Sequence, residues 1–273
     1  MGVSIIDLVI MIAYFIGILA IGYYSMKAIT GFDDYAVAGR NIPMSLLFAT
    51  VGATLLGGGA TIGRVAFVHN TGLVVFVAVL GVATSQILIG LFIAPRVREM
   101  GNVYTIGDIM GYHFGQSGRL VSSIISFIYC ICVFAVQILA MGRILETVTG
   151  LPILPMSILA TIIVIAYTWG GGILAVIYTD AVQFIILMLG IGVAALISLS
   201  NSGGMTIVLE QVASIKPDNL VLDAGWSLLA LIAFFLTFLL GEALAPFHMQ
   251  RYMTTKSSKD AKLGVTIFGV FLV

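Results

Sequence analysis

The stretch VGATLLGGGATIGRV, residues 51–65, decides how the chain is read. It places three consecutive glycines inside an apolar run that is long enough to cross a bilayer. Each glycine costs a helix interior roughly 1 kcal/mol relative to alanine, so the triplet costs about 3 kcal/mol. A spanning helix that carries such a cost near its middle is predicted either to pack closely there or to be interrupted.

The composition around this stretch indicates a polytopic membrane protein. Of the 273 residues, 60% are hydrophobic and only 9% are charged, and the mean hydropathy is +1.17. A soluble domain is about 25% charged, so this chain has too much apolar surface to bury in water. The net charge is zero and basic tracts are absent from the sequence, which argues against a nucleic-acid partner. Cys130 and Cys132 lie in an apolar run and fit neither a zinc site nor a disulfide.

Apolar windows of about 20 residues predict seven spanning segments, and therefore an all-α membrane fold. An eighth apolar run begins near Leu263 and stops at Val273, so we expect the chain to end inside a membrane segment of a longer protein. The first run is a retained helix, because Asp7 stands where a signal peptide carries basic residues. The predicted spans are 5–25, 43–67, 72–94, 120–148, 153–169, 173–199 and 226–248.

The basic residues predict the orientation. With the N-terminus outside the cell membrane, nine of the twelve Lys and Arg residues fall in inner loops, as the positive-inside rule requires. One inner loop is long enough for an interfacial helix at 106–114, whereas the outer segment 201–225 has no strong periodicity. The nine inner residues are Lys27, Arg40, Arg96, Arg98, Arg119, Arg251, Lys256, Lys259 and Lys262.

The glycine stretch has two open interpretations. In hydrocarbon an interrupted helix survives only where it lines a cavity or packs on protein, and secondary transporters use such interruptions to bind ions through freed carbonyls. Gly59 and Gly63 instead form a GxxxG pair that would suit close helix packing. The stretch matches no nucleotide-binding loop, because it lacks the GxGxxG pattern, a terminal lysine and a preceding strand.

A second candidate interruption lies in LLGEALAPFHMQR, residues 239–251. Glu242 is a functional candidate, because a carboxylate at membrane depth costs roughly 2.5–3.5 kcal/mol on insertion scales. The alternative is a structural pairing with a buried base such as Arg64. Pro246 can simply kink or end the helix.

Other polar residues inside the spans also have two interpretations each. Asp180 either holds a cation along an inner vestibule or caps a helix end, and Gln86 and Gln137 either line a pocket or bond between helices. Arg143 and Glu146 are spaced to form a structural ion pair. Catalytic constellations and metal-ligand spacings are absent from the sequence, since its histidines stand far apart, so we expect neither an enzyme nor a metal centre. The histidines are His69, His113 and His248.

Three motifs resemble the sodium:solute symporter family: GFDDYAVAGRNIP at 31–43, YTWGGGILAVIYTDAVQF at 167–184, and PFHMQRYMTTKSSKDAK at 246–262. The T-D-x-x-Q element within the second motif is the most specific. The resemblance implies an inverted-repeat fold of five plus five helices with an extra helix in front. Segment 5–25 would be the extra helix, 43–199 the first repeat, and 226–273 the start of an incomplete second repeat. The two candidate interruptions would then fall in the first helix of each repeat.

The resemblance also implies site residues. Ala53 and Leu56 match positions whose backbone carbonyls bind the coupling sodium, and Asp180 matches an acid on the cation path. Leu55 departs from the family, because proline carriers have an acid there and choline carriers an aromatic residue, so neither solute is assigned. The remaining ligands of the sodium site lie in a later family helix that this chain does not contain. The implied solute-binding residues are Gly57, Gly58, Gly59, Ala60, Thr61, Gln86, Gln137 and Glu242.

The sequence therefore predicts sodium-coupled symport of a small organic solute by alternating access across the plasma membrane. Sodium is the coupling ion, the lipid bilayer is the surrounding partner, and we expect no organic cofactor. The alternative is a transporter-like sensor module fused to a histidine kinase. Sequence beyond Val273 would separate them, because a carrier continues with further helices and a sensor continues with a soluble kinase domain.

Overall fold

The structure is a computed structural model that describes residues 5–241 and 245–273. All regular elements within these ranges are helices, and the single β-bridge found there joins Ile42 to Thr255. The all-α prediction is therefore confirmed. The elements are α1 Ile5–Ala28, α2 Phe32–Val37, η1 Ala38–Arg40, α3 Met44–Leu55, α4 Gly58–Thr71, η2 Gly72–Val74, α5 Val75–Leu88, the π-helical η3 Ile89–Ile93, α6 Ala94–Glu99, α7 Ile106–Thr149, α8 Ile153–Asn201, α9 Met205–Ile215, η4 Pro217–Leu220, α10 Leu228–Gly241, α11 Pro246–Met253 and α12 Ser258–Phe271.

Several helices are long and apolar enough to cross a membrane. By length and composition the described residues contain four, and a fifth if α10 and α11, which are bent by 45°, form one broken span. The four are Ile5–Ala28, Ala60–Glu99, Ile106–Thr149 and Ile153–Asn201. The chain is therefore a multi-pass membrane protein.

The predicted spans 153–169 and 173–199 both belong to α8, which reverses direction at Gly172. Gly172 has φ 54° and ψ −152°, a conformation that side chains other than glycine rarely adopt. A Cβ atom at Gly172 would also stand 2.5 Å from the carbonyl oxygen of Tyr35 in α2. Glycine is required here for both reasons.

The predicted interfacial helix at 106–114 is present as the first part of α7. Thr105 and Asp108 form a capping box at its start, and Gly115 interrupts it with φ 71°. Two short helices, α2 and α9, were not predicted. Each is too short to show a clear apolar period, and both lie in the segments that link the spans.

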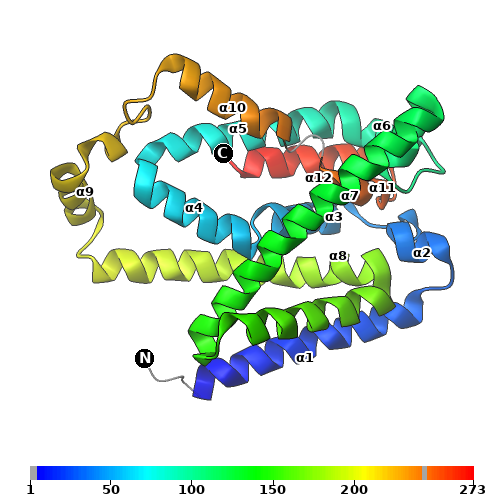
Figure 1. Ribbon diagram of the computed structural model, residues 1–273, viewed down its shortest axis with the longest axis horizontal. Helices are drawn as coiled ribbons and strands as arrows, with labels where there is room; N and C mark the ends of the chain where they lie inside the picture. Colours follow the sequence, from blue (N-terminus) through cyan, green and yellow to red (C-terminus); the bar gives the residue numbers. More distant parts are fainter. Residues whose placement is uncertain (1–4, 242–244) are drawn as a thin grey trace.

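Figure 1 shows how the helices are arranged. Helix α1 lies along α8, and α7 crosses both. Helices α2, α6 and α11 gather at one end of the molecule, and α9 and the N-terminal end of α1 lie at the opposite end (Figure 1). We call these the inner and the outer end after the predicted orientation. The segments that the sequence places in inner loops therefore share one end of the fold.

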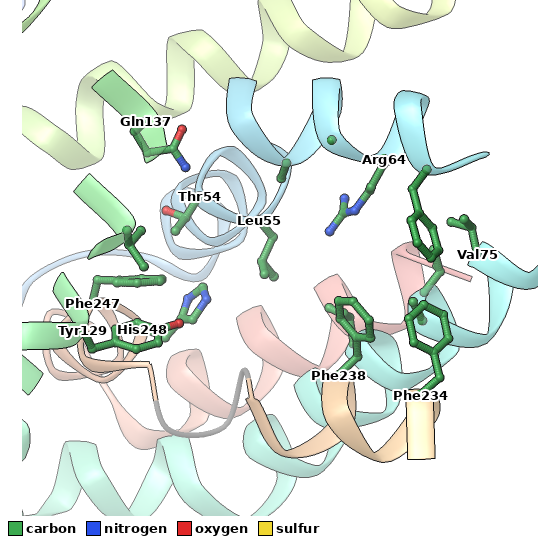
Figure 2. A pocket seen from close by; sticks show the side chains of 17 residues that line it. Thr54, Leu55, Arg64, Val75, Tyr129, Gln137, Phe234, Phe238, Phe247 and His248 are labelled. Atoms are coloured by element: carbon green, nitrogen blue, oxygen red, sulfur yellow. The ribbon is translucent and has the colours of Figure 1, made fainter. Parts of the chain in front are cut away.

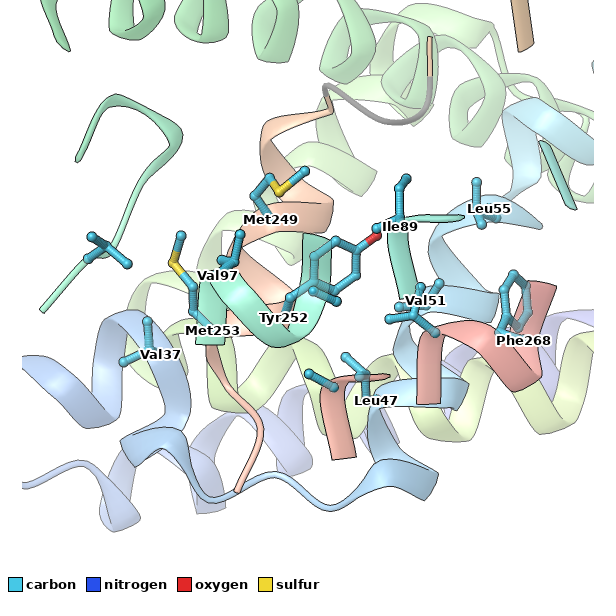
Figure 3. Packing of buried hydrophobic residues seen from close by; sticks show 14 of the residues in the cluster. Val37, Leu47, Val51, Leu55, Ile89, Val97, Met249, Tyr252, Met253 and Phe268 are labelled. Carbon is cyan, nitrogen blue, oxygen red and sulfur yellow. The ribbon is translucent and has the colours of Figure 1, made fainter. Parts of the chain in front are cut away.

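The main apolar cluster joins α3, α5, α11 and α12 near the inner end. Figure 3 shows Leu47 and Val51 of α3 against Phe268 of α12, with Tyr252 of α11 beside them. These four side chains are fully buried. Because lipid tails are as apolar as these side chains, close van der Waals packing rather than the hydrophobic effect holds such helices together.

Backbone hydrogen bonds tie the segments at the inner end to each other. The Ile42 N–H donates to the Thr254 carbonyl at 2.9 Å, and the Lys256 N–H donates to the Ile42 carbonyl at 3.0 Å. The Arg98 guanidinium donates to the Thr255 carbonyl, so α6 joins the same group. The approach to α3 and the link between α11 and α12 are thus held in one register.

Candidate functional site

The predicted interruption in 43–67 is confirmed. Helix α3 ends at Leu55 and α4 begins at Gly58. The Leu56 N–H still donates to the Gly52 carbonyl at 2.9 Å, but no backbone N–H of the described residues donates to the carbonyl of Ala53. The helix is therefore open on the carbonyl side of its break, which is the arrangement that coordinates cations in transporters.

The glycines around the break do not serve close helix packing at every position. A Cβ atom on Gly58 would lie 3.5 Å from Ile144, an ordinary contact, and one on Gly63 would meet nothing within 4 Å. On Gly57 it would lie 3.4 Å from the carbonyl oxygen of Ala53. The glycine triplet therefore leaves space beside the freed carbonyl, and the GxxxG interpretation is not supported at Gly63.

A first cavity of about 410 Å³ lies between α4, α5, α7, α10 and α11. Figure 2 shows the Arg64 side chain extending from α4 into this space, with Phe234 and Phe238 of α10 on the opposite wall. Gln137 of α7 lies at its other side, and Phe247 stacks on Tyr129 with ring centroids 6.1 Å apart. The walls are thus aromatic and apolar with a few polar groups, as in small-molecule sites.

A second, larger cavity of about 730 Å³ lies between the break, α1, α7, α8 and α11. Both Ala53 and Gly57 line it, so the freed carbonyl stands at its wall. The two cavities share Thr54, Val133, Gln137 and Phe247, which places the break where they meet.

The structure brings part of the predicted site together. Ala53, Gly57, Gly58, Gln137 and Asp180 line the second cavity, and Ala60 lines the first. The Thr61 hydroxyl donates to the Leu56 carbonyl at 2.7 Å, across the break. Gly59 belongs to α4. Gln86 lies outside both linings; it is fully buried, and its amide has no hydrogen-bond partner among the described residues. Glu242 lies outside the described residues.

Asp180 is the centre of a buried polar cluster at the inner side of the second cavity. Its Oδ2 accepts from the Arg251 guanidinium at 2.9 Å and from the Thr50 hydroxyl. The Arg251 Nε–H donates to the Thr50 oxygen at 2.8 Å. Thr50 was not predicted from the sequence, and Arg251 was predicted to lie in an inner loop. Spacing alone gives no signal for this cluster, because its members stand on three different helices.

The structural pairing of Arg143 with Glu146 is confirmed at 2.8 Å, but the Arg143 side chain is 64% exposed. That pair is a surface feature within one helix. The Asp180–Arg251 pair, with side chains 13% and 9% exposed, joins α8 to α11. Only the second pair therefore links separate parts of the fold at a cavity.

The FDDY motif orders the inner end through its carboxylates. Asp34 accepts from both the side chain and the N–H of Thr30, and these bonds hold the pKa of that carboxyl below its usual value. The Tyr104 hydroxyl donates to Asp33, which raises the pKa of the phenol. The Arg40 guanidinium donates to the Val103 carbonyl at 3.0 Å. The motif therefore fastens the first inner loop to the loop before α7.

Known proteins resemble this chain over nearly all of its length. The osmoregulated proline transporter of Bacillus subtilis is 28% identical over 256 residues, which are 91% of this chain and 52% of that protein. The sodium/proline symporter of Staphylococcus aureus is 28% identical over 277 residues, 97% of this chain and 54% of that protein. The chain thus spans about half the length of these relatives.

A solved structure shows the same fold. It is the substrate-bound outward-open state of a sodium-coupled sialic acid symporter, with a TM-score of 0.79 and 21% sequence identity; the match covers 98% of this chain and 57% of that one. The fold of this chain is therefore the inverted-repeat transporter fold. The model of the sodium:solute symporter family matches residues 35–273. Since this match covers most of the chain, including the break and the Asp180 cluster, the chain belongs to the sodium:solute symporter family.

Proposed function

We propose that this chain forms the ion-binding and solute-binding part of a sodium-coupled symporter. The observation that carries the proposal is the break between α3 and α4, where the Ala53 carbonyl lacks a backbone donor among the described residues and stands at the wall of a cavity. Freed carbonyls of this kind coordinate sodium in secondary transporters. The relatives named as transporters support a carrier rather than an enzyme or a sensor module.

The proposed sodium ligands are the carbonyls of Ala53 and Leu56. The Leu56 carbonyl accepts one hydrogen bond from Thr61, and a carbonyl oxygen has a second lone pair for an ion. Asp180 lines the same cavity as Ala53 and is the proposed acid of the cation path. Its hydrogen bonds from the described residues all reach Oδ2, so Oδ1 is the oxygen that remains for a cation.

The proposed solute site is the start of α4 with Gln137. Gly57 and Gly58 line the second cavity, Ala60 lines the first, and Gln137 lines both. The walls suit a small organic molecule with an apolar body and a few polar groups. Gly59, Thr61, Gln86 and Glu242 complete the predicted solute set, of which Gln86 lies outside both cavities.

The proposed cycle is alternating access with the N-terminus outside the plasma membrane. In this scheme 5–25 is the extra helix, 43–199 is the first repeat and 226–273 opens the second. The grouping of α2, α6 and α11 at one end fits the prediction that their segments share one side of the membrane, and the basic residues assign that side to the cytoplasm. A reagent that cannot cross the bilayer is expected to label a Met205→Cys variant from outside, and a Lys259→Cys variant only after the membrane is permeabilised.

Uptake into liposomes tests the function. The full protein that carries this chain is reconstituted into liposomes. Uptake of labelled proline, and then of other small organic solutes, is measured under a sodium gradient and, separately, under a potassium gradient. We expect uptake only with sodium. Gly57→Val should raise the sodium concentration for half-maximal uptake, because the new side chain crowds the Ala53 carbonyl. Gly190→Ala is the matched control, since a Cβ there meets nothing within 4 Å. Equal uptake under both gradients would show that uptake is not coupled to sodium.

A further inference from the structure

The cluster of Thr50, Asp180 and Arg251 closes a ring of three hydrogen-bonding groups. The Thr50 hydroxyl donates to Asp180 and accepts from Arg251, while Arg251 also pairs with Asp180 directly. Thr50 is fully buried, and the side chains of Asp180 and Arg251 are 13% and 9% exposed. Each polar group of the ring therefore depends on the other two, because water does not surround them.

Stability alone does not explain a buried ion pair in this position. Replacing such a pair by apolar residues of similar volume is often neutral or stabilising, because desolvation offsets the attraction between the charges. Charged residues at membrane depth are costly, and those that are retained mark functional positions. The pair is more useful as a switch, since it is strong when complete and unfavourable when either partner is withdrawn.

The ring joins three helices that meet at the inner side of the second cavity. Thr50 belongs to α3, Asp180 to the second half of α8, and Arg251 to α11. Helix α3 packs against α8 along this seam, where Gly52 and Phe48 contact Phe184. By contrast α4, on the other side of the break, packs mainly on α7. The ring thus stands on the inner side of the break, between the second cavity and the inner end.

Thr50 also connects the ring to the proposed sodium ligands. It lies one helical turn before Ala53 and Thr54, and the Thr54 hydroxyl donates to the Thr50 carbonyl at 2.8 Å. An ion held by the Ala53 carbonyl would fix the end of α3. A fixed α3 keeps the Thr50 hydroxyl within reach of both charges.

We propose that Thr50, Asp180 and Arg251 form an inner latch, which holds α3 and α11 against α8 and closes the cavity toward the inner end. Sodium at the break stabilises the closed latch through α3. When the ring opens, α3 and α11 separate from α8 and the cavity opens inward. The inference rests on the proposed symport and deepens it, because it assigns Thr50 and Arg251 as positioning residues of the gate.

Cysteine labelling in the full protein tests the latch. Ile177 of α8 is 0% exposed and belongs to an apolar cluster with Ile42, which precedes α3, and Leu46 of α3, so it reports separation of α3 from α8. In a background with Cys130→Ala and Cys132→Ala, the labelling rate of Ile177→Cys by N-ethylmaleimide is measured in liposomes without solute, with sodium and with potassium.

We expect slow labelling that sodium slows further when the latch is native. Thr50→Val, Asp180→Asn and Arg251→Gln should each raise the rate about tenfold or more, because an open minor state is populated at only about 0.1–10% in such equilibria. Arg251→Lys should give an intermediate rate, since lysine keeps the charge but cannot reach Asp180 and Thr50 in the same fork geometry. Arg143→Gln, which breaks the exposed pair, is the matched control and should leave the rate unchanged.

Thr50→Val keeps both charges paired. Its labelling rate therefore decides the test if Asp180→Asn or Arg251→Gln does not elute as a folded protein in size-exclusion chromatography. If the labelling rate of Ile177→Cys is unchanged in both Thr50→Val and Arg251→Gln, the proposed latch is wrong. This holds even if Asp180→Asn alone raises the rate. Failure of the proposed function looks different. The latch variants would still raise labelling, but sodium would not slow it and uptake would be independent of sodium.

Discussion

Helices α3 and α4 are two halves of one predicted span, yet the fold treats them differently. Helix α3 buries Leu47, Val51 and Leu55 against α8 and α12, whereas α4 has no buried residue among its described positions. The interruption separates a half that anchors the fold from a half that borders a cavity. A transporter needs both properties, since its site must be held firmly on one side and be open on the other.

The glycines of the two halves show the same contrast. A Cβ atom on Gly52 of α3 would stand 2.3 Å from the ring of Phe184 and 2.9 Å from that of Phe268. A Cβ atom on Gly63 of α4 would meet nothing within 4 Å. One glycine permits close packing and the other borders open space, although both stand in the same apolar run.

The largest expected effect on the free energy of unfolding comes from the ion pair beside α3, the half of the span that anchors the fold. Arg251→Met leaves the Asp180 carboxylate buried without its partner, and we expect a loss of roughly 3–5 kcal/mol in the free energy of unfolding. The double variant Arg251→Met with Asp180→Leu should regain most of that loss, because it leaves no uncompensated charge. Chemical unfolding of the purified full protein in mixed micelles measures both.

The matched control for this prediction is Arg143→Met, which removes the exposed pair with Glu146 and should cost about 1 kcal/mol or less. If Arg251→Met is as mild as this control, the inner half of the span is not held by the ion pair. The contrast between the anchored and the open half would then rest on apolar packing alone.

The next effect compares the two glycines directly. Gly52→Ala should destabilise the protein by roughly 1–3 kcal/mol, because the new methyl group overpacks the contact with Phe184. Gly63→Ala should stabilise it by about 0.5–1 kcal/mol, because alanine is the better helix former and space is available. Thermal unfolding followed by circular dichroism gives both shifts, and shifts of the same sign would contradict the comparison.

A smaller effect is expected at the junction of the halves. The Thr61 hydroxyl donates to the Leu56 carbonyl across the break, so Thr61→Val should cost about 0.5–1.5 kcal/mol. Thr61→Ser keeps the donor and should retain most of the stability. Thr71→Val is the control, because the Thr71 hydroxyl donates to the Phe67 carbonyl within α4. An equal loss in Thr61→Val and Thr71→Val would show that the bond across the break has no special weight.

The smallest effect concerns the polar approach to α3. The Thr30 hydroxyl and N–H keep the pKa of Asp34 below its ordinary value of 3.8. A lowered pKa in the folded protein stabilises this turn above the unfolded value, and that stabilisation is lost as the pH falls through the folded value. Carbon-detected NMR titration of Asp34 should therefore give a pKa below 3.8. In Thr30→Val the pKa should move up toward 3.8, and an unchanged pKa would exclude the side-chain bond as its main cause.

Much of the fold could be predicted because membrane helices are encoded locally. Apolar windows located the apolar helical segments, and the glycine triplet located the break, since each depends on residues close in sequence. The seven predicted spans compare with four helices of the described residues that are long enough to cross a membrane, or five with the bent pair α10 and α11. The interfacial helix at 106–114 followed from its place in a polar loop. Helix α9 was missed because its 11 residues are too few for a decisive period.

The candidate site was predicted only where backbone or a single helix makes it. Ala53 and Gly57 were assigned through the family resemblance and Gln137 as a polar group in a span, and all three line the second cavity. Gln86 was assigned by the same reasoning but lies outside both cavities, because only the rotation of α5 within the bundle decides which wall it faces.

The sequence by itself determined that the chain crosses a membrane many times and that one of its helices is interrupted at the glycines. The reason is that bilayer thickness and backbone hydrogen bonding act on neighbouring residues. Only the tertiary structure decided that Thr50, Asp180 and Arg251, which are 130 and 71 residues apart, complete one buried ring. Their pairing depends on how three helices pack, and no local pattern records that packing.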